Sequence, residues 1–100
     1  MGRAEADLAV GCGYKVRNGG PGAPAVLFVA ERLQAELEPV LTGWMGHARP
    51  FDFAPDYAPA PGIRRHLCGT PPILSLAALE AALELWQEVD LSQVRRKSIA

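Results

Sequence analysis

Two short apolar runs near the start of the chain have the length of β-strands. Residues 7–12 (DLAVGC) are small and mostly apolar, and Gly13 follows them. Residues 25–30 (AVLFVA) are apolar at every position, a pattern typical of a strand that is buried on both faces. Residues 18–22 (NGGPG) cannot continue a helix or a regular strand, because glycine favours unusual dihedral angles and proline lacks an N–H. The pattern therefore predicts two strands joined by a glycine-rich loop.

Two further segments have the spacing of helices. Residues 31–38 contain two leucines four positions apart, and Pro39 predicts the end of a short helix. A longer helix follows Thr-Pro-Pro at 70–72, and Asp90 is a candidate interruption of it. A helix after an all-apolar strand favours an α/β layer, so the expected fold class is α/β, with two or three strands and a long C-terminal helix. The apolar stripe of this helix, with the spacing i, i+3, i+7 and i+10, consists of Leu76, Leu79, Leu83 and Trp86.

The segment 39–72 shows neither helical nor strand periodicity. Seven prolines interrupt it, but it also contains Trp44 and three other aromatic residues, which is too apolar for a disordered linker. We expect an ordered, irregular segment, in which residues 63–68 (IRRHLC) form a short strand.

The composition indicates one globular domain at most. Of the 100 residues 49% are hydrophobic, and 10 basic residues nearly balance 11 acidic ones. A net charge of −1 provides no field to recruit nucleic acid or an anionic membrane surface. The first ten residues include two acids and no long apolar run, so we expect neither a signal peptide nor a membrane span. Cys12 and Cys68 are expected to stay reduced, and a cytoplasmic protein is the resulting prediction.

Lys15 is the first candidate for chemistry. It follows Tyr14 and stands between the first apolar run and the glycine-rich loop. A lysine amine can bond covalently to an aldehyde cofactor, and pyridoxal phosphate is held by a lysine in this way. The same pattern also fits a solvent-exposed lysine in a turn, and the local residues leave both interpretations open.

Two other residues are candidates for binding a phosphate. Trp44 lies between glycines, and its indole N–H is a hydrogen-bond donor; the alternative is an aromatic anchor of the core. Thr70 precedes the two prolines at the start of the long helix, where a hydroxyl and a helix start form a small anion site. The alternative for Thr70 is an ordinary helix cap.

A metal site is not expected. Its ligands would have to come from Cys12, His47, His66 and Cys68, whose spacing fits no zinc-ligand pattern. We therefore assign the two histidines to packing or hydrogen bonding.

Taken together, these motifs resemble a known family. Residues 6–15 (ADLAVGCGYK) and 18–25 (NGGPGAPA) are similar to the cofactor-lysine segment of bacterial kynureninase. Residues 43–47 (GWMGH) and 69–74 (GTPPIL) resemble two further motifs of that family, in the same order and at matching separations. The resemblance covers essentially the whole chain, and three motifs with consistent spacing are more specific than any one alone.

The resemblance implies a fragment of a fold-type-I pyridoxal phosphate-dependent enzyme, a homodimer with a mainly parallel sheet in its large domain. The family hydrolyses L-kynurenine, and often 3-hydroxykynurenine, to anthranilate or 3-hydroxyanthranilate and L-alanine, within tryptophan catabolism and NAD biosynthesis. On this resemblance, residues 1–72 belong to the cofactor-binding large domain. The helix within 73–100 then leads toward the small C-terminal domain.

Four residues receive roles from the resemblance. Lys15 would hold pyridoxal 5′-phosphate as a Schiff base and shuttle protons at the substrate carbons. Tyr14 would lie beside the cofactor phosphate and is a candidate acid–base group. Trp44 and Thr70 match residues that contact the phosphate, in this family from the neighbouring subunit.

The chain departs from the family pattern in two respects. Val16 and Arg17 stand where the family usually has Tyr-Leu, which alters the packing beside Lys15. The family's aspartate for the pyridine nitrogen, its nearby histidine and its ring-stacking aromatic residue would precede Met1. The arginine that binds the substrate carboxylate would follow Ala100. We therefore expect an internal segment of the enzyme that is inactive and folds poorly in isolation.

Two other functions stay open at this point. Cysteine desulfurases and class V aminotransferases also place a lysine a few residues before a glycine-proline loop, although the motif 43–47 favours kynureninase over them. A function of a different class is that of a non-enzymatic α/β remnant that binds a partner through its strand edges.

Overall fold

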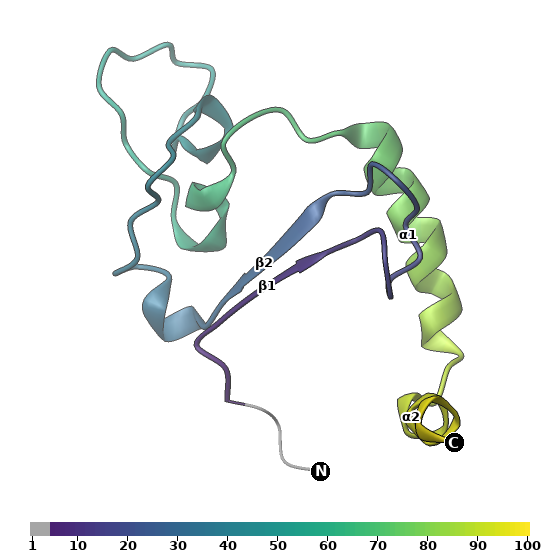
Figure 1. The fold of residues 1–100 in the computed structure, drawn as a ribbon. Coiled ribbons are helices and arrows are strands. Elements are labelled where there is room, and N and C mark those ends of the chain that lie inside the picture. The colour runs from purple at the N-terminus through teal and green to yellow at the C-terminus, as the bar shows by residue number, and fades with distance from the viewer. Residues whose placement is uncertain (1–4) are drawn as a thin grey trace. The chain divides into compact units, whose positions relative to one another are not determined.

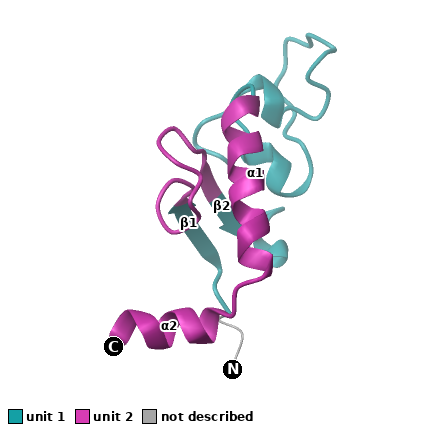
Figure 2. Cartoon of the chain, turned by 90° about the vertical axis from the view of Figure 1, so that its right-hand side faces the viewer, with its two compact units in different colours: residues 1–11, 27–71 teal, residues 12–26, 72–100 magenta. Residues whose placement is uncertain are grey.

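The computed structural model describes residues 5–100, which form two compact units that interleave along the sequence (Figure 2). Unit 1 contains residues 1–11 and 27–71, and unit 2 contains residues 12–26 and 72–100. Residues 1–4, which belong to the first expected domain segment and to the start considered for a signal peptide, lie outside the described residues. Each unit is described separately below.

The two predicted strands are confirmed. β1 (Leu8–Cys12) and β2 (Ala25–Val29) pair in a two-stranded sheet, as Figure 1 shows. The Ala30 N–H donates to the Asp7 carbonyl at 2.9 Å, and the Gly13 N–H donates to the Pro24 carbonyl at 2.9 Å. The sum of the paired residue numbers stays constant from one end to the other, so the strands run antiparallel.

The expectation that the second strand is buried on both faces is wrong. Only Val29 is buried in β2, whereas Leu27 and Phe28 are about half exposed. A continuous apolar run predicts two covered faces, but the described residues supply a single neighbouring strand. The apolar run therefore forms a strand, but residues 5–100 do not bury both of its faces.

The segment after β2 is irregular, as expected, but two predictions within it are wrong. The helix expected over 31–38 is limited to a 3₁₀ turn, η1 (Glu31–Leu33), because a segment this short before Pro39 cannot propagate an α-helix. The strand expected over 63–68 is a 3₁₀ helix, η3 (Gly62–His66). Gly62 has a φ of +63°, which turns the chain after Pro61, and the Leu67 N–H then bonds locally to the Arg64 carbonyl at 3.0 Å.

The long helix is confirmed, including its start and its interruption. α1 (Ile73–Gln87) begins directly after Pro72 and contains the predicted apolar stripe, of which Leu79 is buried. α2 (Leu91–Ile99) begins after Asp90, whose carboxylate accepts a hydrogen bond from the Ser92 N–H at 2.8 Å. With two strands and two α-helices among residues 5–100, the chain is α/β, as expected.

No helix within residues 5–100 combines the length and the apolar character needed to cross a bilayer.

The Asp90 cap predicts an acid-sensitive start of α2. Its hydrogen bonds from Ser92 favour the ionised carboxylate and lower the pKa of Asp90 below the ordinary value of 3.8. The stabilisation is therefore fully present above that value and is lost as the pH falls through the lower pKa of the folded state. We expect the ¹³Cα shifts of residues 91–99 to lose helical character in this acid range, with α1 as the internal reference.

Asp90→Asn is the matched variant, because an asparagine also caps a helix but does not titrate in acid. We expect its α2 shifts to be independent of pH in the same range. The same acid-induced loss in the Asn variant would contradict the assignment to Asp90.

Candidate functional site

Lys15 opens a tight turn at the end of β1. The Asn18 N–H donates to the Lys15 carbonyl at 2.9 Å, and Asn18 has a φ of +58°, a conformation that asparagine tolerates better than most residues. The next N–H, that of Gly19, donates to the Gly13 carbonyl at 3.0 Å. Backbone hydrogen bonds therefore fix the turn on both sides of the lysine.

Two glycines allow this turn to pack closely. A Cβ atom on Gly13 would lie 2.7 Å from the Pro24 carbonyl oxygen, and a Cβ atom on Gly19 would lie 2.9 Å from the Gly13 carbonyl oxygen. The same two Cβ atoms would also approach the side chain of Leu79 in α1, at 3.2 and 2.9 Å. The buried Leu79 of unit 2 therefore packs against the loop that carries Lys15.

The Lys15 side chain is exposed and makes no ion pair with any residue of 5–100. Its Nζ lies 5.2 Å from the centre of the Tyr14 ring, a cation–π arrangement worth roughly 0.5–1 kcal/mol at an exposed site. The neighbouring cation, Arg17, donates from Nη1 to the Cys12 carbonyl at 3.2 Å. Because this cation–π interaction is weak, the amine stays available to a ligand.

Trp44 lies in unit 1, at the start of the 3₁₀ helix η2 (Trp44–Gly46). The two glycines that flank Trp44, Gly43 and Gly46, lie against the backbone of residues 65–68. A Cβ atom on Gly43 would overlap the carbonyl of Cys68, and one on Gly46 would lie 2.6 Å from the Arg65 carbonyl oxygen. η2 and η3 pack on each other through these contacts.

Thr70 follows this backbone contact directly, two residues after Cys68. Its side chain is exposed and has no hydrogen-bond partner among residues 5–100. The indole N–H of Trp44, whose residue is 46% exposed, also has none within that range. The contact between Gly43 and Cys68 therefore joins the two segments that carry the candidate phosphate donors.

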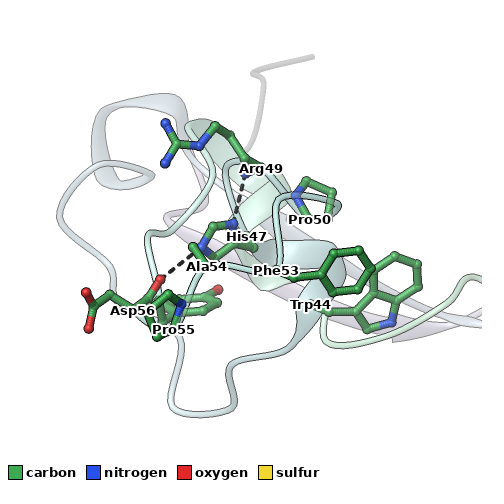
Figure 3. A pocket seen from close by; sticks show the side chains of 9 residues that line it. Trp44, His47, Arg49, Pro50, Phe53, Ala54, Pro55 and Asp56 are labelled. Atoms are coloured by element: carbon green, nitrogen blue, oxygen red, sulfur yellow. Dashed lines mark hydrogen bonds between the residues drawn. The ribbon is translucent and has the colours of Figure 1, made fainter.

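A cavity of about 350 Å³ lies beside Trp44 (Figure 3). The rings of Trp44 and Phe51 form a T-shaped pair, with 5.7 Å between the ring centres and an angle of 72° between the ring planes. His47 forms part of the wall, and the Arg49 N–H donates to its Nδ1 at 2.9 Å. The lining residues are Trp44, His47, Arg49, Pro50, Phe53, Ala54, Pro55, Asp56 and Tyr57.

The expected site residues thus fall into two groups. Lys15 and Tyr14 belong to unit 2, whereas Trp44 and Thr70 belong to unit 1. The sequence pattern did not predict the close backbone contacts of Gly43 and Gly46, although two glycines around a tryptophan were a signal for them. It placed His47 among packing or hydrogen-bonding residues, and in the structure this histidine is buried and hydrogen-bonded at both ring nitrogens.

Each unit presents unused polar groups. Within residues 5–100, Lys15 of unit 2 offers a primary amine without a carboxylate partner, and Trp44 and Thr70 of unit 1 offer two unused hydrogen-bond donors. Within residues 5–100, the structure brings together no group of three His, Cys, Asp or Glu side chains.

Comparison with known proteins confirms the resemblance seen in the motifs. The chain is 60% identical to the kynureninase of Deinococcus radiodurans over 100 residues, which is 24% of the length of that protein. It is 50% identical over 97 residues to the kynureninases of Burkholderia mallei and Burkholderia pseudomallei, or 23% of their length. No protein-family model matches the chain. The chain therefore spans about a quarter of the curated relatives that it matches.

The contact between Gly43 and Cys68 predicts that a methyl group added at Gly43 destabilises the fold. We expect Gly43→Ala to lower the free energy of unfolding by about 1–3 kcal/mol, because the new Cβ atom overlaps a backbone carbonyl that cannot rotate away. Urea unfolding followed by tryptophan fluorescence measures the change.

Gly69→Ala is the matched control in the same unit. A Cβ atom on Gly69 meets no atom within 4 Å, so its unfolding free energy should stay within about 0.5 kcal/mol of the parent value. Equal stability of the two variants would rule out the close contact.

Proposed function

We propose that this chain supplies the cofactor lysine and the phosphate contacts of a kynureninase active site. The proposed activity is the hydrolysis of L-kynurenine to anthranilate and L-alanine, or of 3-hydroxykynurenine to 3-hydroxyanthranilate and L-alanine, with pyridoxal 5′-phosphate as cofactor. The amine of Lys15, which is exposed, has no ion pair among residues 5–100 and stands on a backbone-fixed turn, carries the proposal. Because the chain spans about a quarter of its relatives, the activity is proposed for a protein that contains this segment.

The relatives narrow the choice of enzyme. Their name is kynureninase at 50 to 60% identity, which favours this activity over that of a cysteine desulfurase or a class V aminotransferase. The same relatives favour an enzymatic role over that of a non-enzymatic remnant that binds a partner.

Lys15 has two tasks in this proposal. Its Nζ would hold the cofactor at the aldehyde carbon, and the amine would move protons at the substrate carbons. When bound, pyridoxal phosphate supplies the electron sink that weakens bonds at the substrate α-carbon. The turn closed by Asn18 and Gly19 holds the backbone of Lys15, so the amine moves only through its own side-chain torsions.

Tyr14 is proposed as the acid–base group beside the lysine. Its ring lies 5.2 Å from Nζ, so a cofactor joined to Lys15 would be within reach of the phenol. The Tyr14 side chain is half exposed and has no hydrogen-bond partner among residues 5–100, which leaves the hydroxyl free to donate to a phosphate or to move a proton.

Trp44 and Thr70 are proposed to bind the cofactor phosphate through the indole Nε1–H and the hydroxyl Oγ1–H. Charge-assisted hydrogen bonds of this kind are stronger than neutral ones. The close approach of Gly43 to Cys68 supports this pairing, because it joins the two short segments that present the donors.

We further propose a cytoplasmic homodimer in which one copy supplies Lys15 and the other copy supplies Trp44 and Thr70. Residues 1–72 would then belong to the large domain of a fold-type-I enzyme in tryptophan catabolism and NAD biosynthesis, and residues 73–100 would lead toward its small domain. The similarity to kynureninases over the full 100 residues supports this arrangement.

Covalent labelling tests the role of Lys15. The chain is incubated with pyridoxal 5′-phosphate, reduced with borohydride, digested and mapped by mass spectrometry. We expect the label at Lys15 and its loss in Lys15→Arg, because a guanidinium does not form the bond. Lys97→Arg is the matched control, since Lys97 is the other lysine of the sequence. Equal labelling of both lysines would mean unspecific reaction with the aldehyde.

Activity is measured in a chimera of the Deinococcus radiodurans kynureninase in which these 100 residues replace the matching quarter. We expect anthranilate release from L-kynurenine, and its loss in the Lys15→Arg chimera. A folded chimera that takes up the cofactor but releases no anthranilate would refute the proposed activity.

The phosphate contacts are tested in the same chimera. Trp44→Phe and Thr70→Val keep shape but remove a donor, so each should weaken pyridoxal 5′-phosphate binding by about tenfold, the equivalent of one charged hydrogen bond. Pyridoxal, which lacks the phosphate, should bind parent and variants equally. Equal losses for both ligands would show that these residues do not contact the phosphate.

Mixing tests the dimer arrangement. Neither Lys15→Arg nor the double variant Trp44→Phe/Thr70→Val should be active alone at limiting cofactor. Mixed dimers should recover activity, because one of their two sites combines intact residues from both copies. No recovery after verified exchange would contradict the arrangement in trans.

A further inference from the structure

His47 is the buried polar residue of unit 1, with 8% of its surface exposed. Both of its ring nitrogens are engaged, as the dashed lines in Figure 3 show. Nδ1 accepts the Arg49 N–H at 2.9 Å, and Nε2 lies 3.2 Å from the Asp56 carbonyl oxygen. A backbone N–H can only donate and a carbonyl can only accept, so the ring is held with its proton on Nε2.

These two bonds close a loop whose inner polar contacts are local: the Asp52 N–H donates to the Arg49 carbonyl at 3.2 Å, and the Asp52 carboxylate pairs with the Arg49 guanidinium. Residues 48–58 contain two prolines and no helix or strand, and Phe53 within them is 90% exposed with a φ of +49°. The Ala48 N–H bonds to the Ala58 carbonyl at 2.8 Å across the base of the loop. His47 adds a second closure above this base, and its ring meets Tyr57 edge-on at 5.4 Å.

The same histidine is linked to Trp44 from two sides. Its backbone N–H donates to the Trp44 carbonyl at 3.2 Å and ends η2. The loop that its ring closes carries Phe51, which forms a T-shaped pair with the indole. Loss of the imidazole would therefore release both the loop and the aromatic contact that orients Trp44.

We propose that His47 is a positioning residue for Trp44: by closing loop 48–58 through both ring nitrogens, it holds Phe51 against the indole and fixes the direction of the indole N–H. This inference rests on the proposed role of Trp44 in binding a phosphate. His47 itself touches neither cofactor nor substrate in this arrangement.

The first experiment measures the order of Trp44 in the full chain. Trp86→Phe leaves Trp44 as the sole indole, and acrylamide quenching then reports its exposure. We expect His47→Ala to increase the quenching constant. His47→Asn keeps an acceptor for Arg49 and His47→Gln keeps a donor for Asp56, so both should give intermediate values. Circular dichroism checks that the variants fold.

His66→Ala is the matched control. His66 is the other histidine of the chain, lies in the same unit, and has an Nε2 without a hydrogen-bond partner among residues 5–100. Its loss should leave the quenching of Trp44 at the parent value. Parent-like quenching in folded His47→Ala would overturn the proposal, and parent-like Asn and Gln variants would do so if His47→Ala fails to fold.

The second experiment separates positioning from general stability. His47→Ala should weaken binding of pyridoxal 5′-phosphate by about the same factor as Trp44→Phe, and should add nothing to that loss in the Trp44→Phe background. If His47→Ala still weakens cofactor binding in the Trp44→Phe background, the proposal is overturned. If Trp44→Phe leaves cofactor binding unchanged, the phosphate role of Trp44 fails, and the quenching series still decides whether His47 orients the ring.

Discussion

Close approach of backbone segments at glycine holds the candidate residues in both units. In unit 2 the turn that carries Lys15 closes because Gly13 and Gly19 have no side chain to separate it from neighbouring carbonyls. In unit 1 Gly43 lies on the carbonyl of Cys68 in the same way. Since backbone contacts fix these segments, the amine of Lys15 and the indole N–H of Trp44 need no intramolecular partner. The reactive groups therefore stay free for a ligand.

The hydrophobic core contributes little to this order. Only Val29, Ala60 and Leu79 are buried hydrophobic residues in the described part of the chain, whereas many large apolar side chains are exposed. Exposed apolar surface on this scale is unusual for a protein that functions without a cover. It agrees with a chain that spans about a quarter of its relatives, whose remaining sequence is available to bury such surface.

The sequence patterns predicted those elements that depend on interactions between residues close together in the chain. The strands, the start of α1 at Ile73 and its interruption at Asp90 all follow from apolar runs and helix signals within a few residues. The strand expected over 63–68 failed because a strand needs a partner, which no local pattern reveals, and Gly62 turned the segment into η3 instead. The candidate site residues were predicted from motifs, and their roles stay predictions. Their division between two units and the Gly43–Cys68 contact depend on distant parts of the chain, so sequence spacing could not predict them.

The two groups of residues divide the work of the proposed site. An exposed lysine amine can react with many aldehydes, so Lys15 alone would give chemistry without selectivity. Selectivity for a phosphorylated aldehyde requires donors whose direction is fixed before the ligand arrives, since a freely rotating indole would lose binding energy in becoming ordered. In the proposed arrangement His47 meets this requirement through the hydrogen bonds of its two ring nitrogens to backbone groups. Because both ring nitrogens are already engaged, His47 can order Trp44 without binding the ligand itself.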